Sequence, residues 1–261
     1  MRLASLRRRR LLESWMDKVR GIARQALRAV GLERIHHPSF VDLMRRENVD
    51  TVIDVGANNG QFGEELRERG YAGRIISFEP GSAAFAGLAA RAAADPLWDA
   101  YQLGVGDAPG ELEILITQAD VFSSFKAPSD YTNAKFVGAT PERREKVRVI
   151  RLDEFFAEHP GTLTDTTYLK VDTQGFEFEV LQGTGDCLAR VCAVQMELPL
   201  RILYDGQKSL MEMVSWMADH GFEIGMAKEN GFDWQACRLL ELDVAFVRSG
   251  EAYQPPVVRP A

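Results

Sequence analysis

Short apolar runs alternate with charged, helix-like segments from residue 51 onwards, and this alternation restricts the fold more than any other feature of the sequence. The first three runs are Thr51–Ala57, Arg74–Pro80 and Tyr101–Asp107, separated by segments long enough for one helix each. Strands that alternate with single helices form a parallel sheet with right-handed crossovers. The sequence therefore predicts an α/β fold with a doubly wound, mostly parallel sheet.

The second half of the chain continues this pattern. Glu111–Thr117 alternates in polarity after Ala108-Pro109-Gly110, so it is expected to turn back as an antiparallel strand. Further strands are expected at Val147–Leu152, Tyr168–Thr173, Val191–Leu198 and Glu241–Arg248, the last of them antiparallel. Helices are expected at Gln61–Arg69, Ser82–Ala93 with Ser82 as its cap, Asp153–Glu158, from Glu177, and around Leu210–Met217. Residues 118–146 are expected to be irregular, and a loop of that length is usually functional or disordered.

The chain divides into three parts by composition: a lead-in over residues 1–50, the α/β domain over 51–250, and a proline-rich tail over 251–261. Apolar residues recur at steps of three and four from Leu12 to Val30, so a basic amphipathic helix is expected there. It is expected either to pack on the body or a second subunit, or to contact anionic lipid through residues 7–30. Acidic residues interrupt its apolar face, which argues against a signal peptide.

The cysteine content indicates where in the cell the protein is expected, and the charge distribution indicates which partners it is expected to bind. The three cysteines form no CxxC pair and no apolar run is long enough for a membrane span, so we expect a cytoplasmic protein, with the inner face of the membrane as the alternative. Residues 1–31 carry nine basic and two acidic side chains, which leaves −14 on the rest of a chain whose total is −7. An acidic body is poorly suited to a phosphate backbone, so no nucleic-acid partner is expected.

A glycine-rich turn follows the first expected strand. Gly56, Asn58 and Gly60 let the backbone approach a ligand closely, but they do not form the GxGxxG pattern of a dinucleotide site. Asp54 lies two residues before the first of these glycines, where its charge would repel a pyrophosphate. The same charge suits the cationic methionyl group of S-adenosylmethionine, so the turn favours that cofactor.

Two more acidic residues end the next strands. Glu79 ends the second strand, where a carboxylate accepts hydrogen bonds from both hydroxyls of a ribose. Asp107 ends the third, where it either contacts adenine or only forms a turn with Ala108-Pro109-Gly110. Both positions fit an adenosine site, and neither distinguishes a nicotinamide cofactor from S-adenosylmethionine.

Charged residues within the later strands provide candidates for catalysis. Lys170 and Asp172 alternate onto one face of their strand, and Glu197 ends the neighbouring strand. Ligands bind at the carboxyl ends of strands in open α/β sheets, so the two carboxylates are expected to converge there. A buried ion pair without a chemical role is the alternative for Lys170 and Asp172.

A hydroxyl acceptor must lose its proton, and a positioned base provides roughly 10²–10⁴-fold in rate. His36 and His37 lie before the domain, and His159 and His220 lie at expected helix ends, so the base is expected to be a carboxylate. We expect Asp172 as the base, with Glu197 second and Lys170 orienting Asp172. No metal site is expected, although Mg²⁺ on Asp172 and Glu197 stays open as an alternative. The loop Tyr204–Gln207 either contacts the acceptor or is an ordinary turn.

Five motifs together resemble those of the FkbM family of methyltransferases. They are VIDVGANNGQF in the first strand and turn, FEP at Phe78–Pro80, LGVGD at Leu103–Asp107, RLDEFF at Arg151–Phe156 and YLKVDTQGFEFEVLQG at Tyr168–Gly183. The resemblance runs from about Thr51 to Arg248. It implies a class I methyltransferase (Rossmann-like) fold and O-methylation, typically of sugar or polyketide hydroxyls. It also implies cofactor contacts at Asp54, Gly56, Asn58, Gly60 and Glu79.

The chain is therefore expected to be an S-adenosylmethionine-dependent O-methyltransferase whose acceptor is a sugar, a polysaccharide or a secondary metabolite. Two alternatives stay open. An NAD(P)-dependent oxidoreductase shares the glycine turn and Glu79, but the chain lacks the GxGxxG pattern and a Tyr-x-x-x-Lys motif. A non-catalytic module that binds S-adenosylmethionine would retain the same turn.

Overall fold

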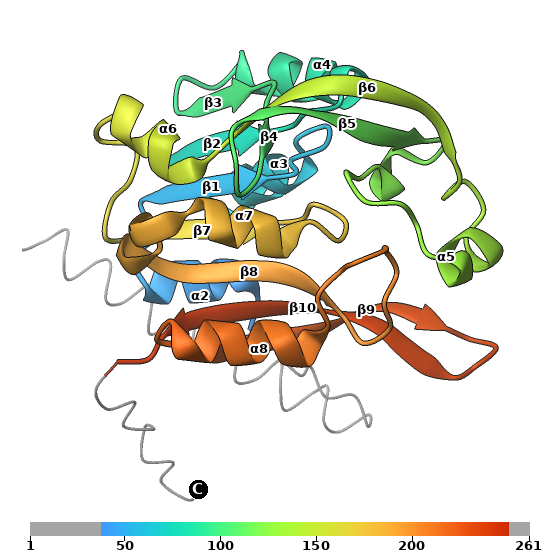
Figure 1. Ribbon diagram of the computed structural model, residues 1–261. Helices are drawn as coiled ribbons and strands as arrows, with labels where there is room; N and C mark the ends of the chain where they lie inside the picture. The colour runs from blue at the N-terminus through green and yellow to red at the C-terminus, as the bar shows by residue number, and fades with distance from the viewer. Residues whose placement is uncertain (1–37, 251–261) are drawn as a thin grey trace, which may run out of the picture. The chain divides into compact units, whose positions relative to one another are not determined.

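A seven-stranded sheet forms the centre of the computed structural model, which describes residues 38–250 (Figure 1). Its strands are β1 (Thr51–Val55), β2 (Arg74–Phe78), β3 (Trp98–Tyr101), β7 (Thr167–Val171), β8 (Val191–Pro199), β9 (Phe222–Asp233) and β10 (Arg238–Arg248). Their order across the sheet is β3-β2-β1-β7-β8-β10-β9. The basic helix expected before residue 31 and the tail after residue 250 lie outside the described residues.

The directions of the strands confirm the expected sheet and correct its edge. β1 pairs in parallel with β2 and β7, β2 with β3, and β7 with β8. β10 is antiparallel to both of its neighbours, β8 and β9, as expected of the last strand. β10 does not lie at the edge of the sheet, because β9 takes the outer position. The sequence analysis does not predict β9 as a strand.

Helices cover both faces of the sheet, which makes it doubly wound. Val52 of β1 belongs to a core formed with α2 (Phe40–Arg46), α3 (Gln61–Glu68) and α4 (Ser82–Ala92). Its neighbour Ile53 belongs to the opposite core, formed with α6 (Leu152–Glu158), α7 (Glu177–Gly183) and α8 (Leu210–Asp219). Successive side chains of a strand point to opposite faces, so each buried strand supplies both cores.

A smaller, three-stranded sheet and two short helices correct the expected structure of residues 101–146. β4 (Gly104–Val105), β5 (Gly110–Thr117) and β6 (Pro141–Ile150) have the order β4-β6-β5, with β5 antiparallel to β6. The third expected strand is thus divided between the two sheets. The segment expected to be irregular contains a 3-10 helix, η1 (Asp120–Phe122), then α5 (Asp130–Lys135) and the first half of β6. In Figure 1, α5 and the β9–β10 hairpin lie on the same side of the sheet.

Two helix N-termini are fixed in different ways. Ser209 caps α8 with a capping box to Glu212. Ser82 is not a cap, because Gly81 takes that position and offers no side chain. Instead, the backbone N and Oγ of Ser82 each donate to the carboxylate of Glu145 on β6, at 3.0 Å. Within residues 38–250, no helix is long and apolar enough to cross a membrane.

Candidate active site

The turn after β1 brings the backbone against the end of β7. Gly56 has φ +78°, and a Cβ at this position would lie 1.8 Å from the backbone oxygen of Asp172. Only glycine fits such an approach and such a φ. Gly60, with φ +87°, is the N-cap of α3, and Asn58 between them also has a positive φ, +49°. The turn is thus held close to the carboxyl end of β7.

Glu79 holds this turn from the end of β2. Its side chain is buried, and its Oε2 accepts from the backbone N–H of Asn58 at 2.9 Å. Its Oε1 accepts from the backbone N–H of Gly81 at 2.7 Å. The two hydrogen bonds fix the direction of the carboxylate before any ligand binds.

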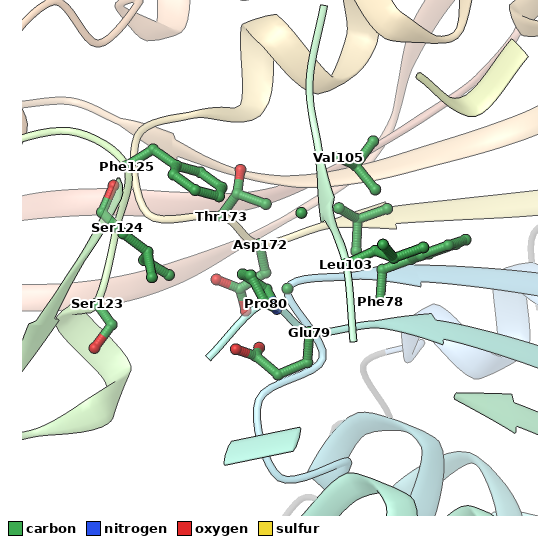
Figure 2. Close-up of a pocket in the computed structure, with 14 residues that line it drawn as sticks. Phe78, Glu79, Pro80, Leu103, Val105, Ser123, Ser124, Phe125, Asp172 and Thr173 are labelled. Carbon is green, nitrogen blue, oxygen red and sulfur yellow. The ribbon is translucent and has the colours of Figure 1, made fainter. Parts of the chain in front are cut away.

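A pocket of about 470 Å³, counted to its open mouth, lies between this turn and the smaller sheet. Gly56, Glu79 and Asp172 line one part of it, and Leu103 lines another. Figure 2 shows the carboxylates of Glu79 and Asp172 on one side of the pocket, with Ser123–Phe125 facing them.

Asp54, Lys170 and Asp172 form a row of alternating charge across β1 and β7. Lys170 Nζ lies 3.4 Å from Asp54 Oδ1 and 3.2 Å from Asp172 Oδ2. Asp54 is fully buried and also accepts from Ser77 Oγ at 3.4 Å. Burial acts to lower the pKa of Lys170, but Asp172 and Asp54 outweigh it and raise that pKa. Burial raises the pKa of Asp54, and Lys170 opposes the shift.

Gln174 connects the two candidate carboxylates. Its Nε2 donates to Asp172 Oδ1 at 2.9 Å and to Glu197 Oε2 at 2.8 Å. Tyr204 OH donates to Gln174 Oε1 at 2.8 Å, which fixes the orientation of the amide. Asn230 donates to the other oxygen of Glu197. Asp172 and Glu197 therefore converge at the ends of β7 and β8, as the sequence predicts.

Several carboxyl groups near Asp172 have raised pKa values, so the folded protein holds them partly protonated near neutral pH. Burial raises the pKa of Glu177 to about 7. It raises the pKa of Glu241 to about 8, with a further contribution from the charge of Glu177. The pKa of Glu197 lies well above its usual value, first through burial and then through the charge of Asp172. A cation bound beside these groups would favour their ionised forms.

Of the sequence-predicted residues, Gly56, Glu79 and Asp172 line the pocket, and the other six do not: Asp54, Asn58, Gly60, Asp107, Lys170 and Glu197. Asp107 is exposed, and its backbone oxygen accepts from Arg151. A Cβ added at Gly60 would meet Leu88 and Trp98, so this glycine serves the packing of α3. His159 and His220 are the C-cap residues of α6 and α8, which confirms their expected positions at helix ends.

The sequence analysis does not predict that Gln174 bridges Asp172 and Glu197, or that Ser123–Phe125 line one side of the pocket. The sequence analysis assigns no role to Gln174, and for the loop Tyr204–Gln207 it gives two alternatives, contact with the acceptor or an ordinary turn. The Gln174-Gly175 pair after a strand signals a turn, because both residues have positive φ. Ser123–Phe125 carries no such signal in the sequence, because these residues reach the pocket only through the folding of the smaller sheet. The described residues contain no group of three or more His, Cys, Asp or Glu that could hold a metal.

Comparisons with known proteins identify a related family. The model of the Methyltransferase FkbM domain matches residues 54–224, well over half of the chain. No curated protein matches.

Several solved structures are similar to the chain at low identity. The methyltransferase FkbM from Methylobacillus flagellatus KT has a TM-score of 0.47 and 13% identity, over 75% of this chain and 43% of that one. The chain thus spans less than half the length of that protein. M. capricolum TrmK, in complex with S-adenosyl-homocysteine, has a TM-score of 0.44 and 8% identity, over 82% and 70% of the two chains. Streptococcus pneumoniae Sp1610, described as a tRNA (m1A22) methyltransferase in complex with S-adenosyl-L-methionine, has a TM-score of 0.46 and 11% identity, over 84% of this chain and 77% of that one.

Proposed function

Because the chain belongs to the FkbM methyltransferase family, we propose that it methylates a hydroxyl of a sugar, a polysaccharide or a secondary metabolite. Its fold is the expected class I methyltransferase fold, and the family match is to a methyltransferase domain. The oxidoreductase alternative loses its support, since the glycine turn and Glu79 are accounted for by this family. The acceptor and the O-methylation are the parts that the proposal adds.

The residues of the pocket fit S-adenosylmethionine as the methyl donor. When bound, this cofactor supplies an electrophilic methyl group on a positively charged sulfur. Glu79, fixed by the backbone of Asn58 and Gly81, provides the carboxylate for the ribose hydroxyls. The turn at Gly56 allows close approach of the backbone, and Asp54 with Asp172 provides negative charge beside it.

Asp172 is the base in this proposal. Its side chain is 39% exposed, so an acceptor hydroxyl can reach it, and both of its oxygens are held, by Lys170 and by Gln174. One of these oxygens takes the hydroxyl proton as the acceptor oxygen attacks the methyl group. Lys170 orients the carboxylate and balances its charge. Glu197 is the second candidate, but it is more deeply buried and is held by Gln174 and Asn230.

The observation that carries the proposal is the bridged pair of carboxylates at the ends of β7 and β8, beside the pocket that Glu79 lines. A methyl donor with a good leaving group needs mainly alignment and a place for the proton. A module that only binds the cofactor would need Glu79 and the turn. It would not need a half-exposed carboxylate fixed from both sides.

Two substitutions separate binding from turnover. Glu79→Ala is expected to weaken the binding of S-adenosylhomocysteine by roughly 10–100-fold, the worth of one or two charge-assisted hydrogen bonds. Asp172→Asn is expected to lower the rate of methyl transfer roughly 10²–10⁴-fold and to change that affinity by less than about threefold. Calorimetric titration measures the first effect, and transfer of a labelled methyl group to a panel of glycans and hydroxylated metabolites measures the second.

The outcomes of these measurements test the cofactor, the base and the methylated atom separately. No binding of S-adenosylhomocysteine to the native protein would contradict the cofactor. Binding together with an undiminished rate for Asp172→Asn would move the base to another residue, with Glu197→Gln as the next variant. A product labelled on nitrogen or carbon in place of oxygen would contradict the O-methylation.

A further inference from the structure

A second cavity lies beyond the cofactor pocket, between α5, the chain after β8 and the tip of the β9–β10 hairpin. It is about 1040 Å³ when counted to its open mouth, and it has no lining residue in common with the cofactor pocket. Tyr131, Arg201, Phe232, Asp233 and Arg238 supply its polar and aromatic lining. Aromatic and apolar walls with a few placed charges are typical of ligand sites.

Arg201 is held in this cavity by an aromatic ring. Its guanidinium lies 3.6 Å from the centroid of the Tyr131 ring. Tyr131 OH donates to Asp233 Oδ2 at 2.7 Å, so the ring is itself fixed. Thr132 Oγ1, next to Tyr131, donates to the backbone oxygen of Leu203 at 2.7 Å, which ties α5 to the chain beyond Arg201. Stacking of this kind pre-organises a guanidinium and leaves its N–H groups available.

The charged residues that line the cavity, two arginines and one aspartate, leave it with a net positive charge. Its single acidic lining residue, Asp233, forms an ion pair with Lys135 at 2.7 Å and accepts from the backbone N–H groups of Gln235 and Ala236. The hydrogen bond from Lys135, followed by that from Tyr131, lowers the pKa of Asp233, so it stays ionised and occupied.

Neither arginine of the cavity has such a partner. Within residues 38–250, Arg201 and Arg238 form no ion pair, and Arg238 donates only to the backbone oxygens of Ala236 and Cys237. Two positive charges without a carboxylate partner therefore face the cavity, in a protein whose net charge is −7.

The aromatic side chains of the hairpin add a surface for a ring. Phe232 lines the cavity, and Trp234 packs edge-on against it with the ring centroids 4.7 Å apart. Trp234 is 85% exposed, which is unusual for so large an apolar side chain. An amphipathic ligand with one apolar face, such as a sugar ring, can lie on these side chains.

We propose that this cavity is a subsite for an acidic saccharide acceptor, in which Arg201 and Arg238 bind a carboxylate or phosphate group of the sugar. The inference rests on the proposed function, and it adds the charge of the acceptor and the residues that recognise it. Arginine recognises both kinds of anion through paired N–H donors. A nucleic acid fits less well, because it needs a run of phosphate contacts and the cavity offers two arginines.

The subsite is close in sequence to Glu197, which Gln174 joins to the proposed base Asp172. Arg201 follows Glu197 by four residues, so their Cα atoms lie at most roughly 14 Å apart. The backbone N–H groups of Leu200 and Arg201 both donate to the backbone oxygen of Leu240, which fixes the subsite to β10. We expect a hydroxyl at Asp172 and an anionic group at Arg201 to belong to one acceptor molecule.

The test measures binding of three sugars to the protein saturated with S-adenosylhomocysteine. Methyl β-D-glucuronide and glucose 6-phosphate carry the two kinds of anion, and methyl β-D-glucoside is the neutral control. At least one charged sugar is expected to bind about tenfold more tightly than the neutral one, and the difference between the two charged sugars identifies the anion. Arg201→Gln and Arg238→Gln are each expected to remove most of this preference and to leave S-adenosylhomocysteine binding unchanged.

Arg144→Gln is the matched control, because it removes an exposed arginine on β6 that does not line the cavity. It is expected to retain the preference for a charged sugar. Equal binding of all three sugars, no binding of either charged sugar, or an equal loss in Arg144→Gln would overturn the subsite. Tight binding of a tRNA that is lost in Arg201→Gln would assign the cavity to a different class of acceptor. If S-adenosylhomocysteine itself failed to bind, the proposed function would fail, and this result is separate from those on the sugars.

Discussion

Gln174 has a backbone φ of +56°, a conformation that non-glycine residues adopt at a cost of about 1–3 kcal/mol. This conformation ends β7 and turns the amide back towards Asp172 and Glu197. The next residue, Gly175, has φ +95°, and a Cβ there would lie 2.7 Å from Tyr204 Cβ. The backbone at Gln174 and Gly175 and the side chain of Tyr204 therefore fix the amide together.

Tyr204→Phe is expected to release this amide with little change in the fold. Without the hydroxyl donor, the Gln174 amide can rotate and present its oxygen to one of two carboxylates, which repels it. Methyl transfer should fall by roughly tenfold, because Asp172 loses its hydrogen bond from Gln174. The pKa of Glu197 should rise further, so the part of the rate that depends on ionised Glu197 should reach its plateau at a higher pH. The pH profile of kcat, with the affinity for S-adenosylhomocysteine as the control, measures this effect. An unchanged profile together with a reduced melting temperature would mean that Tyr204 serves only the packing.

At the scale of single residues, the sequence predicts the site where the relevant side chains end strands. Asp54, Glu79, Asp172 and Glu197 occupy strand ends whose order follows from the α/β pattern, so their convergence could be expected. From distant parts of the chain, Asn230 donates to Glu197 and Tyr204 donates to the Gln174 amide that bridges the two carboxylates. No local sequence pattern predicts these contacts, because they depend on the tertiary packing of segments that are distant in the sequence.

At the scale of elements, the parts that the sequence misses are those with little buried apolar surface. β9 is an edge strand in which only its first and last residues are buried, so it has no apolar alternation to detect. α5 has the polar sequence DYTNAK and depends on Ser129 as its cap and on contacts with β9. The buried strands β1 and β7, by contrast, are buried along their whole length and were predicted within about two residues.

Glu145→Ala tests how α4 is fixed to the smaller sheet. Two hydrogen bonds from Ser82 end on Glu145, and α4 has no acidic residue in its first turn to interact with its N-terminal dipole. The loss is expected to lower the free energy of unfolding by about 1–2 kcal/mol, the usual worth of a helix cap. Denaturant unfolding measures it. Glu113→Ala is the control, because Glu113 is an exposed partner of Arg144 on the same sheet, and it should cost less than about 0.5 kcal/mol. Equal effects in the two variants would contradict a capping role.

At the scale of the whole molecule, carboxyl groups gather at the carboxyl edge of the sheet, while the second cavity is lined by two arginines. The first arrangement suits a cationic methyl donor, and the second suits an anionic part of the acceptor. Both lie on strands or hairpins of one sheet, β7, β8, β9 and β10, so the fold sets the distance between them. The net charge in the sequence shows neither arrangement, because it sums over both.

The carboxylates at this edge should make stability without cofactor fall as the pH rises. Glu177 and Glu241 have folded-state pKa values of about 7 and about 8, raised from 4.5. The folded state therefore keeps protons that the unfolded state loses, and stability declines from about pH 4.5 through pH 8. Between pH 6 and 9 the loss is on the order of a few kcal/mol, and the melting temperature should fall by roughly 5–10 °C.

S-adenosylmethionine should oppose this decline, because its cationic sulfur stabilises the ionised carboxylates, whereas neutral S-adenosylhomocysteine should oppose it less. The ratio of the two affinities is therefore expected to grow from pH 6.5 to pH 8.5 in favour of S-adenosylmethionine. Thermal melts and calorimetric titrations at each pH measure both effects, and Glu241→Gln, which removes one titrating group, should flatten the slope. A melting temperature that stays constant from pH 6 to 9 in the native protein would show that these carboxylates are solvated and carry no excess charge. A constant affinity ratio would place the sulfur of the cofactor away from them.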